Sequence, residues 1–205
     1  TVIGVGGDGT NYALVNAIVN LTDRDTSLSI PTYGIFPVGT GCDFASALGI
    51  PKASLATVEW LSVARPKLTD IGVVQFTDRD GATIRRCYLN IASGGISGDV
   101  SRRVNSALVK RPWTYLAATI TSILRTSPKN VRVKLDGYEF YTGGALLVTC
   151  ANGTTFGHGM RIAPDARIDD GFLDVVLVRD ASKFTALKAL NRVYNATHLT
   201  HPAVC

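Results

Sequence analysis

Two glycine-rich segments contain the residues best suited to chemistry on phosphate groups. The segment VGGDGT, residues 5–10, follows the β-branched run TVI after Gly4, and GTGCDF follows the apolar run YGIFPV. Glycine lets a backbone approach phosphate oxygens closely and aim its N–H groups at them, although a tight strand-to-helix turn would also use it. One such loop alone is weak support, but two in the same context favour a nucleotide phosphate site. Neither is a Walker A sequence, because no GKS or GKT occurs.

Polar side chains in these loops have roles that suit phosphate chemistry. Asp8, held between glycines, is a candidate to accept a proton from a substrate hydroxyl or to hold catalytic Mg²⁺ through water. Thr40 can hydrogen-bond a phosphate, and Thr10 and Asp43 are predicted to cap the helices that follow. We expect the phosphate site to form where these side chains meet.

An aspartate-rich turn later in the chain offers a second kind of chemistry. Asp169 and Asp170 lie in the segment DARIDDG, shortly before an apolar run. Magnesium prefers hard oxygen ligands, which such a turn supplies, but the two aspartates would also serve simply to cap the turn. Asp136-Gly137 is interpreted only as a hairpin turn.

The first part of the chain alternates strands and helices in a way that would position both glycine loops. Apolar spacing predicts strands at residues 1–5 and 33–38 and helices at residues 10–20, 43–48 and 53–64, with a polar loop at 21–29. This alternation implies a parallel sheet with crossover helices. In such sheets ligands bind beyond the carboxyl ends of the strands, where both loops are expected.

The pattern changes near Pro66. Hairpins are predicted around residues 78–81 and 136–137, a strand at 171–180, and helices at 101–109, 113–124 and 182–195. The predicted fold class is therefore α/β: a parallel-sheet nucleotide-binding domain, incomplete here, followed by an antiparallel β-sandwich domain with inserted helices. We predict the domains at residues 1–65 and 66–205.

Composition limits the class of protein. The 205 residues are 46% hydrophobic and 18% charged, which is typical of a globular chain, and no apolar run is long enough to span a bilayer. The chain opens in mid-strand without an initiating methionine, which suggests a fragment. Its four cysteines are widely spaced and form no CxxC pair, so we expect free thiols in a reducing, cytoplasmic compartment.

The net charge of +5 is unevenly distributed. Asp99 is the one acid in a stretch that carries eight basic residues: Arg102, Arg103, Lys110, Arg111, Arg125, Lys129, Arg132 and Lys134. Such a stretch suits either a solvated face or anionic lipid headgroups, with Trp113 and Tyr115 placed to reach the headgroup region. Nucleic acid is not expected as a partner, because no known reading motif accompanies the charge.

Four segments resemble the catalytic domain of diacylglycerol kinases and their bacterial lipid-kinase relatives, in the superfamily of sphingosine and ceramide kinases. They are GGDGT (6–10), FPVGTGCDFA (36–45), NIASGGISGDV (90–100) and ANGTTFGHGMRIAPDARIDDGFLDVVLV (151–178). The resemblance covers nearly the whole chain in the right order. It implies a nucleotide-binding domain, a β-sandwich domain and ATP in the cleft between them. The activity implied is transfer of the γ-phosphoryl group of ATP to a lipid hydroxyl, as in phospholipid biosynthesis.

The resemblance also implies roles for individual residues. Asp8 would be catalytic, and the ATP-contacting residues would be Gly6, Gly7, Asp8, Gly9, Thr10, Asn11, Gly39, Thr40 and Gly41. A structural Mg²⁺ would take the Asp170 carboxylate and the backbone carbonyls of Arg167 and Phe172. The implied partners are ATP and a lipid substrate, reached by peripheral association with a membrane surface; a homodimer stays open.

Two other functions stay open. An NAD kinase would use the same GGDGT loop on a soluble dinucleotide, although the second loop and the APDARIDDG segment favour a lipid kinase. A non-catalytic nucleotide- or lipid-binding homologue is the other, since Tyr12, Ala13 and Cys42 stand where bacterial members usually have Asn, Glu and Asn. The family's first strands would precede Thr1, and its late acidic motif would follow Cys205. The identity of the phosphorylated lipid is not encoded in any short motif.

Overall fold

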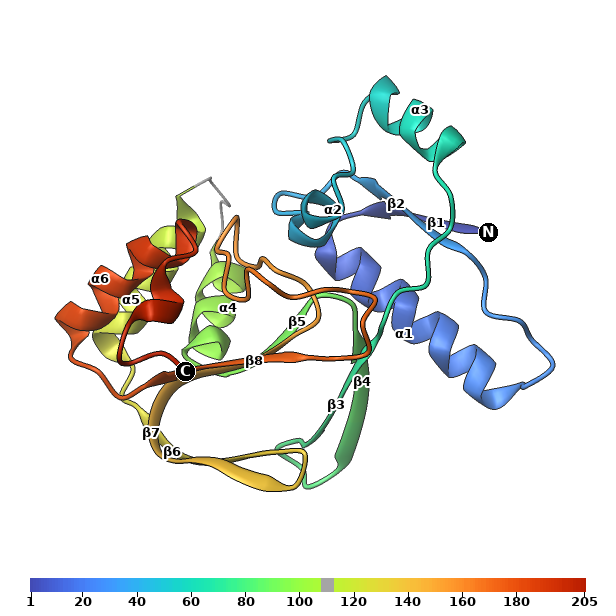
Figure 1. The fold of residues 1–205 in the computed structure, drawn as a ribbon. Helices are drawn as coiled ribbons and strands as arrows, with labels where there is room; N and C mark the ends of the chain where they lie inside the picture. Colours follow the sequence, from blue (N-terminus) through green and yellow to red (C-terminus); the bar gives the residue numbers. More distant parts are fainter. Residues whose placement is uncertain (108–112) are drawn as a thin grey trace. The chain divides into compact units, whose positions relative to one another are not determined.

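The computed structural model describes residues 1–107 and 113–205, and these form two compact units (Figure 1). The first unit comprises Thr1–Ala92, Asn152–Gly159 and Asp165–Leu173. The second unit comprises Ser93–Ala151, Met160–Pro164 and Asp174–Cys205. Both units are therefore assembled from three separate segments of the chain.

The first unit begins with the predicted strand–helix–strand crossover. Strands β1 (Val2–Gly6) and β2 (Tyr33–Pro37) pair in parallel, and helix α1 (Asp8–Arg24) connects them. Two short helices follow, α2 (Asp43–Ala47) and α3 (Leu55–Val63). Strands β3 (Gly72–Thr77) and β4 (Thr83–Tyr88) then form an antiparallel pair whose turn is the predicted one.

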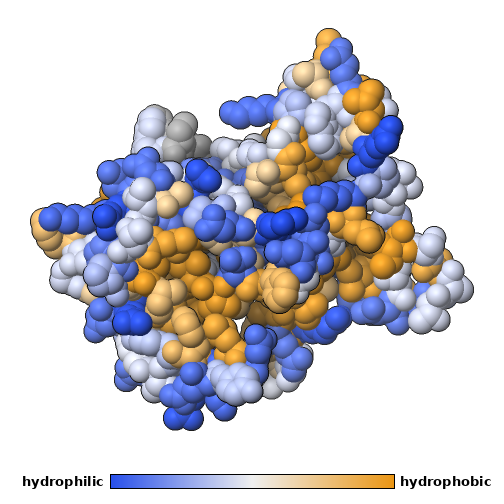
Figure 2. All heavy atoms as spheres, viewed as in Figure 1, coloured by the Kyte–Doolittle hydropathy of each residue, from blue (hydrophilic) through white to orange (hydrophobic). Residues whose placement is uncertain are grey.

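The core of the first unit lies beside β2 and α2. Its buried residues are Ile35, Cys42, Phe44, Ala45 and Ile50, with Trp60, Leu89 and Ile168 packed against them. Helix α3 buries only Thr57 fully, and Figure 2 shows apolar side chains on the surface in its region, where Leu55 and Val63 are exposed. Helix α3 is thus held mainly through Trp60 and Thr57.

The chain returns to the first unit at Asn152. This side chain is fully buried, and its Nδ2 donates to the carbonyl oxygens of Asp70 at 2.9 Å and Leu89 at 2.7 Å. The backbone N–H groups of Asn152 and Gly153 both donate to the Asn90 carbonyl. Buried hydrogen bonds of this kind fix the later segment against the earlier one.

The second unit is built around the long strand β7 (Tyr138–Ala151). It pairs antiparallel with β6 (Lys129–Leu135) on one side and with β8 (Asp174–Arg179), and β5 (Ile91–Gly95) completes the sheet. Its helices are α4 (Ile96–Ser106), α5 (Thr114–Arg125), α6 (Lys183–Tyr194) and the 3₁₀ turn η1 (His198–Thr200). The buried core joins Ile123 of α5, Leu146 of β7 and Ala186 of α6.

The predicted fold class is confirmed: an α/β chain with a small parallel sheet and a separate antiparallel sheet that carries inserted helices. The predicted domain boundary at residues 65–67 stays a prediction. The two compact units are each built from three segments and do not correspond to a single boundary in the sequence. Among the described residues, none of the helices has both the length and the apolar character needed to cross a bilayer.

Several predicted helix boundaries and caps were wrong. Helix α1 was predicted at 10–20, but it starts at Asp8 and continues through four residues of the predicted loop, because the amides of Thr10 and Asn11 already bond to the Gly7 carbonyl. The N-caps are Gly7 and Cys42, not Thr10 and Asp43. Helix α4 begins at Ile96, five residues before its predicted start, and its predicted end at Val109 lies outside the described residues.

A buried histidine makes the second unit sensitive to acid. His198 is fully buried, and its Nε2 donates to the Ile162 carbonyl at 2.8 Å, while its Nδ1 has no partner in the described part of the chain. Burial lowers the pKa of His198, partly offset by that hydrogen bond. The unfolded chain therefore takes up a proton first as pH falls below about 6.5, and the folded state loses stability there.

We expect the free energy of unfolding to decrease between pH 7 and pH 5, and His198→Gln to flatten this decrease. Glutamine keeps a donor for the Ile162 carbonyl but does not titrate. His201→Gln, three residues away and partly exposed, serves as the matched control. Urea unfolding at a series of pH values measures the effect, and an equal pH slope in the wild type and His198→Gln would contradict it.

Candidate functional site

The two glycine loops lie against each other at the carboxyl ends of β1 and β2. A Cβ atom on Gly39 would come within 2.4 Å of the Gly7 Cα, and one on Gly7 within 3.0 Å of the Gly39 Cα. The Val38 amide also donates to the Gly6 carbonyl at 3.1 Å. Only glycine at both positions permits this approach, so these two glycines serve the contact between the loops.

Gly9 has a different reason to be glycine. It lies in the first turn of α1, it is exposed, and a Cβ built on it would meet no atom within 4 Å. Glycine inside a helix costs about 1 kcal/mol relative to alanine, so a position with free space around it would favour alanine. No protein atom in the described structure requires glycine there, which leaves space for an external group near the backbone.

Asp8 links the first loop to the start of α2. Its carboxylate accepts hydrogen bonds from the Asp43 amide at 3.1 Å and the Phe44 amide at 3.2 Å, one on each oxygen. The carboxylate thus supplies the cap that no side chain of α2 provides. Its orientation is fixed by two backbone donors from the neighbouring loop.

Asp43 extends this connection to the segment around residue 158. It is 8% exposed, and its two oxygens accept from the amides of His158 and Gly159, both at 3.0 Å. The three residues Gly157, His158 and Gly159 all have positive φ, and His158 at 63° is in a region rarely adopted by residues with a Cβ. A Cβ on Gly41 would lie 3.1 Å from the His158 Nδ1 and 3.4 Å from Asp8 Oδ2. The sequence pattern predicts only a capping role for Asp43 and no role for His158.

Cys42 stabilises the second loop through a hydrogen bond from its thiol. It has a φ of 53°, and its thiol donates to the Gly39 carbonyl at 3.3 Å. Burial, together with the charges of Asp8 and Asp43, raises the pKa of the Cys42 thiol, so the thiol stays protonated. The cysteine therefore acts here as a hydrogen-bond donor within the loop.

The remaining predicted nucleotide contacts divide into exposed and buried positions. Thr40 is exposed on the second loop, whereas Asn11 is 3% exposed and its Oδ1 accepts from the Tyr33 hydroxyl at 2.7 Å. The Thr10 side chain packs against Gly6, where a Cβ would approach its Oγ1 to 2.2 Å. The geometry brings the two loops together but turns Asn11 and Thr10 toward the protein.

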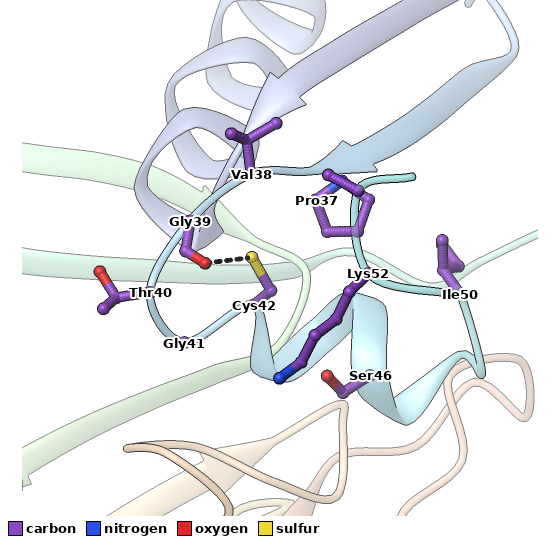
Figure 3. A pocket seen from close by; sticks show the side chains of 10 residues that line it. Pro37, Val38, Gly39, Thr40, Gly41, Cys42, Ser46, Ile50 and Lys52 are labelled. Carbon is purple, nitrogen blue, oxygen red and sulfur yellow. Dashed lines mark hydrogen bonds between the residues drawn. The ribbon is translucent and has the colours of Figure 1, made fainter. Parts of the chain in front are cut away.

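A pocket of about 270 Å³ opens beside the second loop (Figure 3). Its lining comes from the loop, from α2 and from the segment before α3: Pro37, Val38, Gly39, Thr40, Gly41, Cys42, Ser46, Ile50, Lys52 and Ala53. The amides of Gly39, Thr40 and Gly41 donate no hydrogen bond to any part of the chain that the structure describes. The pocket thus combines apolar walls with backbone and side-chain donors.

The acidic turn forms its own local network. Asp170 is exposed, and its Oδ1 accepts from the Phe172 amide at 3.1 Å, while the Gly171 amide donates to Asp70 Oδ2 at 2.7 Å. Lys67 Nζ lies 2.6 Å from Asp169 Oδ2, and this hydrogen bond lowers the pKa of Asp169. The capping role considered for the two aspartates is thus present for Asp170.

The donors at this turn suit Mg²⁺ in kind, since it is commonly bound by one or two carboxylates together with water. Asp170 is exposed, and its hydrogen bond from the Phe172 amide uses only Oδ1. Within residues 1–107 and 113–205, however, no three His, Cys, Asp or Glu side chains group closely enough to hold a metal. A metal here would therefore depend on backbone carbonyls and water.

Two glycine loops lie in contact at the carboxyl ends of parallel strands, which is the place where open α/β sheets bind their ligands. Comparison with known families is consistent with this class. Residues 1–75 match the diacylglycerol kinase catalytic domain, and residues 90–205 match the YegS C-terminal NAD kinase beta sandwich-like domain. The second match alone covers more than half of the chain, so the chain belongs to the diacylglycerol kinase-like family of lipid kinases, as the sequence resemblance predicted.

Individual relatives agree. The chain is 29% identical over 205 residues to the diacylglycerol kinase of Bacillus subtilis, covering 97% of this chain and 61% of that protein. It is 31% identical over 177 residues to a probable YegS-like lipid kinase of an Enterobacter species, covering 85% and 55%. A diacylglycerol kinase crystal structure from Bacillus anthracis superposes with a TM-score of 0.59 at 26% identity, covering 92% and 57%. The chain thus spans less than two thirds of the length of these relatives.

Proposed function

We propose that this protein is a lipid kinase that transfers the γ-phosphoryl group of ATP to the hydroxyl of diacylglycerol or a related lipid. In this reaction the lipid oxygen bonds to the γ-phosphorus, the bond from that phosphorus to the β–γ bridging oxygen breaks, and ADP leaves. Phosphoryl transfer depends mainly on positioning and charge neutralisation. The proposal rests on family membership and on the two loops that meet at one edge of a parallel sheet.

The observation that supports it most directly is Gly9. A ligand phosphate close to the helix backbone would explain a glycine that no protein neighbour requires. Gly9→Ala should therefore raise the stability of the protein by about 0.5–1 kcal/mol while weakening ATP binding. If the alanine variant kept full ATP affinity, the loop would have no role in phosphate binding.

The activity itself is tested with the full-length gene product. Radiolabel transfer from ATP to a panel of lipids, with NAD as the alternative acceptor, identifies the substrate class. Labelled lipid phosphate supports the proposal. Labelled NADP would instead favour the NAD kinase-like alternative, and transfer to neither acceptor would favour the non-catalytic homologue.

Asp8 is proposed as the catalytic carboxylate. Its oxygens are oriented by the Asp43 and Phe44 amides, and it lies beside Gly41 at the centre of the two loops. A carboxylate held this way can accept the proton that the lipid hydroxyl loses. Mg²⁺, when bound, would neutralise phosphate charge.

The structural Mg²⁺ is proposed at Asp170, with the carbonyls of Arg167 and Phe172. We expect Mg²⁺ to raise the melting temperature of the wild type but not that of Asp170→Ala, which removes the only carboxylate of this ligand set. Asp80→Ala, in an exposed turn of the β3–β4 hairpin, is the matched control and should keep the Mg²⁺ response. An unchanged Mg²⁺ response in Asp170→Ala would contradict this site.

A membrane surface is the proposed source of the lipid substrate, and α5 provides the best-suited face. Trp113, Leu116, Ile120 and Leu124 are exposed at helical spacing and so lie on one side of the helix. Lys183 of α6 donates to the carbonyl of Leu124 and so brings a basic side chain to the end of this face, whereas Arg103 of α4 bonds to the buried Ser122 on the other side of α5. Apolar side chains beside basic ones suit an anionic bilayer, where each nearby cation contributes about 1 kcal/mol.

Vesicle sedimentation with the full-length protein should show binding that increases with anionic lipid content and decreases with salt. Replacing Arg102, Arg103, Lys110 and Arg111 by glutamine should weaken it; Lys110 and Arg111 lie outside the described residues. Ile120→Ser combined with Leu124→Ser should weaken binding at any salt concentration. Leu55→Ser, at a more exposed apolar residue on α3, is the control. Equal binding to neutral and anionic vesicles would refute this face.

A further inference from the structure

The pocket beside the second glycine loop has one charged side chain among its lining residues, Lys52. In Figure 3 this side chain runs across the first turn of α2, and its nitrogen ends near Ser46. The carboxylates closest to the loop, Asp8 and Asp43, are each engaged by two backbone amides. Within the described part of the chain, Lys52 forms no ion pair.

The backbone beneath Lys52 is fixed even though its side chain is exposed. Thr57 is fully buried, and its hydroxyl lies 2.7 Å from the Lys52 carbonyl and 3.1 Å from that of Pro51. The Ala53 amide donates to the Pro37 carbonyl, at the end of β2, at 3.3 Å. The backbone at Lys52 is therefore held by Thr57 of α3 on one side and, through Ala53, by the end of β2 on the other.

The chemistry of the pocket indicates what it can hold. Three loop amides without partners in the described structure, two hydroxyls and one ammonium group face or border it, and none of its lining residues is acidic. Its other wall is apolar, formed by Pro37, Ile50 and Ala53. A volume of about 270 Å³ is near the lower limit for small-molecule sites, so it suits part of a nucleotide rather than all of it.

We propose that Lys52 is a phosphate-binding residue of the nucleotide site and that the pocket holds one phosphate of ATP or ADP with the adjoining sugar. This inference rests on the proposed function, because it assumes that the glycine loops bind a nucleotide. Lys52 neutralises the phosphate as a point charge, and the loop amides supply directed hydrogen bonds. The apolar wall contacts the sugar.

Nucleotide binding without lipid tests this role directly. Titration of the full-length protein with ADP, ATP and adenosine should show Lys52→Met weakening ADP and ATP about tenfold or more, as expected for a lost charge-assisted contact. Methionine keeps an apolar stem of similar length, so adenosine affinity should be unchanged. Lys52→Arg should retain most of the affinity, and the salt dependence of ADP binding should become shallower in Lys52→Met. Lys134→Met, an exposed lysine of β6, is the matched control.

Two results would overturn the role of Lys52: ADP binding in Lys52→Met equal to that of the wild type, or an equal loss for adenosine and ADP, which would indicate a purely structural effect. A different result would refute the proposed lipid kinase activity. A wild type that binds ADP but phosphorylates no lipid would refute lipid transfer alone, and the ADP-to-adenosine comparison would still decide the role of Lys52. A wild type that phosphorylates lipid with an ATP KM unaltered in Lys52→Met would refute the role of Lys52 alone.

Discussion

Asp8→Asn is expected to reduce phosphoryl transfer at least about 100-fold in the full-length protein, the loss typical of removing a general base. Asparagine keeps the size of the side chain but replaces one carboxylate oxygen with an NH₂ group. Because both oxygens of Asp8 accept backbone amides of α2, one of these two bonds must also be lost. The variant should remain folded, with a modest loss of stability of about 1 kcal/mol.

The measurement is lipid phosphate formed per unit time, together with the unfolding curve of the same preparation. Asp23→Asn, on the exposed end of the same helix and bonded to Arg85 at 3.1 Å, is the control and should keep wild-type turnover. Wild-type turnover in folded Asp8→Asn would remove Asp8 from the catalytic role. If Asp8→Asn did not fold, the hydrogen bonds from Asp8 to the start of α2 would be needed for folding. Asp8→Glu, which keeps the charge, would then separate this structural role from the catalytic role.

Asp43→Ala should lower the free energy of unfolding by about 3–6 kcal/mol, because two hydrogen bonds to a buried charged group are lost. The substitution leaves the amides of His158 and Gly159 without their buried acceptor, and hydrogen bonds to charged groups contribute about 1.5–3 kcal/mol each. The left-handed turn at residues 157–159 would then lose the group that holds it in an unfavoured conformation. Denaturant unfolding measures the change.

The β3–β4 turn offers a matched control for this prediction. Asp78 also accepts two backbone amides, from Asp80 and Ala82, but in an exposed turn where water can replace the lost acceptor. Asp78→Ala should therefore cost less than about 1 kcal/mol. If the two alanine variants were equally destabilised, burial of the Asp43 carboxylate would not be the cause of its effect.

The sequence was sufficient for the features of this fold that depend on local pattern. Apolar runs predicted β1 and β2, and the alternation of strands and helices predicted that the two glycine loops would lie at the same end of the sheet. Phosphate binding at these loops stays a prediction. The two turns around Asp78 and Gly137 were predicted from their turn residues alone. These features depend on neighbours within a few residues, so one sequence is enough to infer them.

The connections within the site could not be predicted in the same way. Asp43 and His158 are separated by 115 residues, and the contact of Asp8 with Phe44 spans 36. A capping preference predicted that Asp43 would cap its own helix, but Asp8 already occupies that place. Local propensity also failed at Gly9. A glycine at this position suggested a loop, but Gly9 lies within helix α1. Propensity is a weak guide where long-range hydrogen bonds decide the conformation.

The interleaving of the two units has a consequence for how such a protein could change during evolution. Because each unit draws on three segments, a single crossover between genes cannot exchange one unit for that of a relative. A hybrid joined near residue 92 would combine Asn90 of one parent with Asn152 of the other, although these residues bond directly. Recombination between related genes should therefore be tolerated mainly where it exchanges loops within one segment. New substrate specificity should arise by point substitution rather than by exchange of whole units.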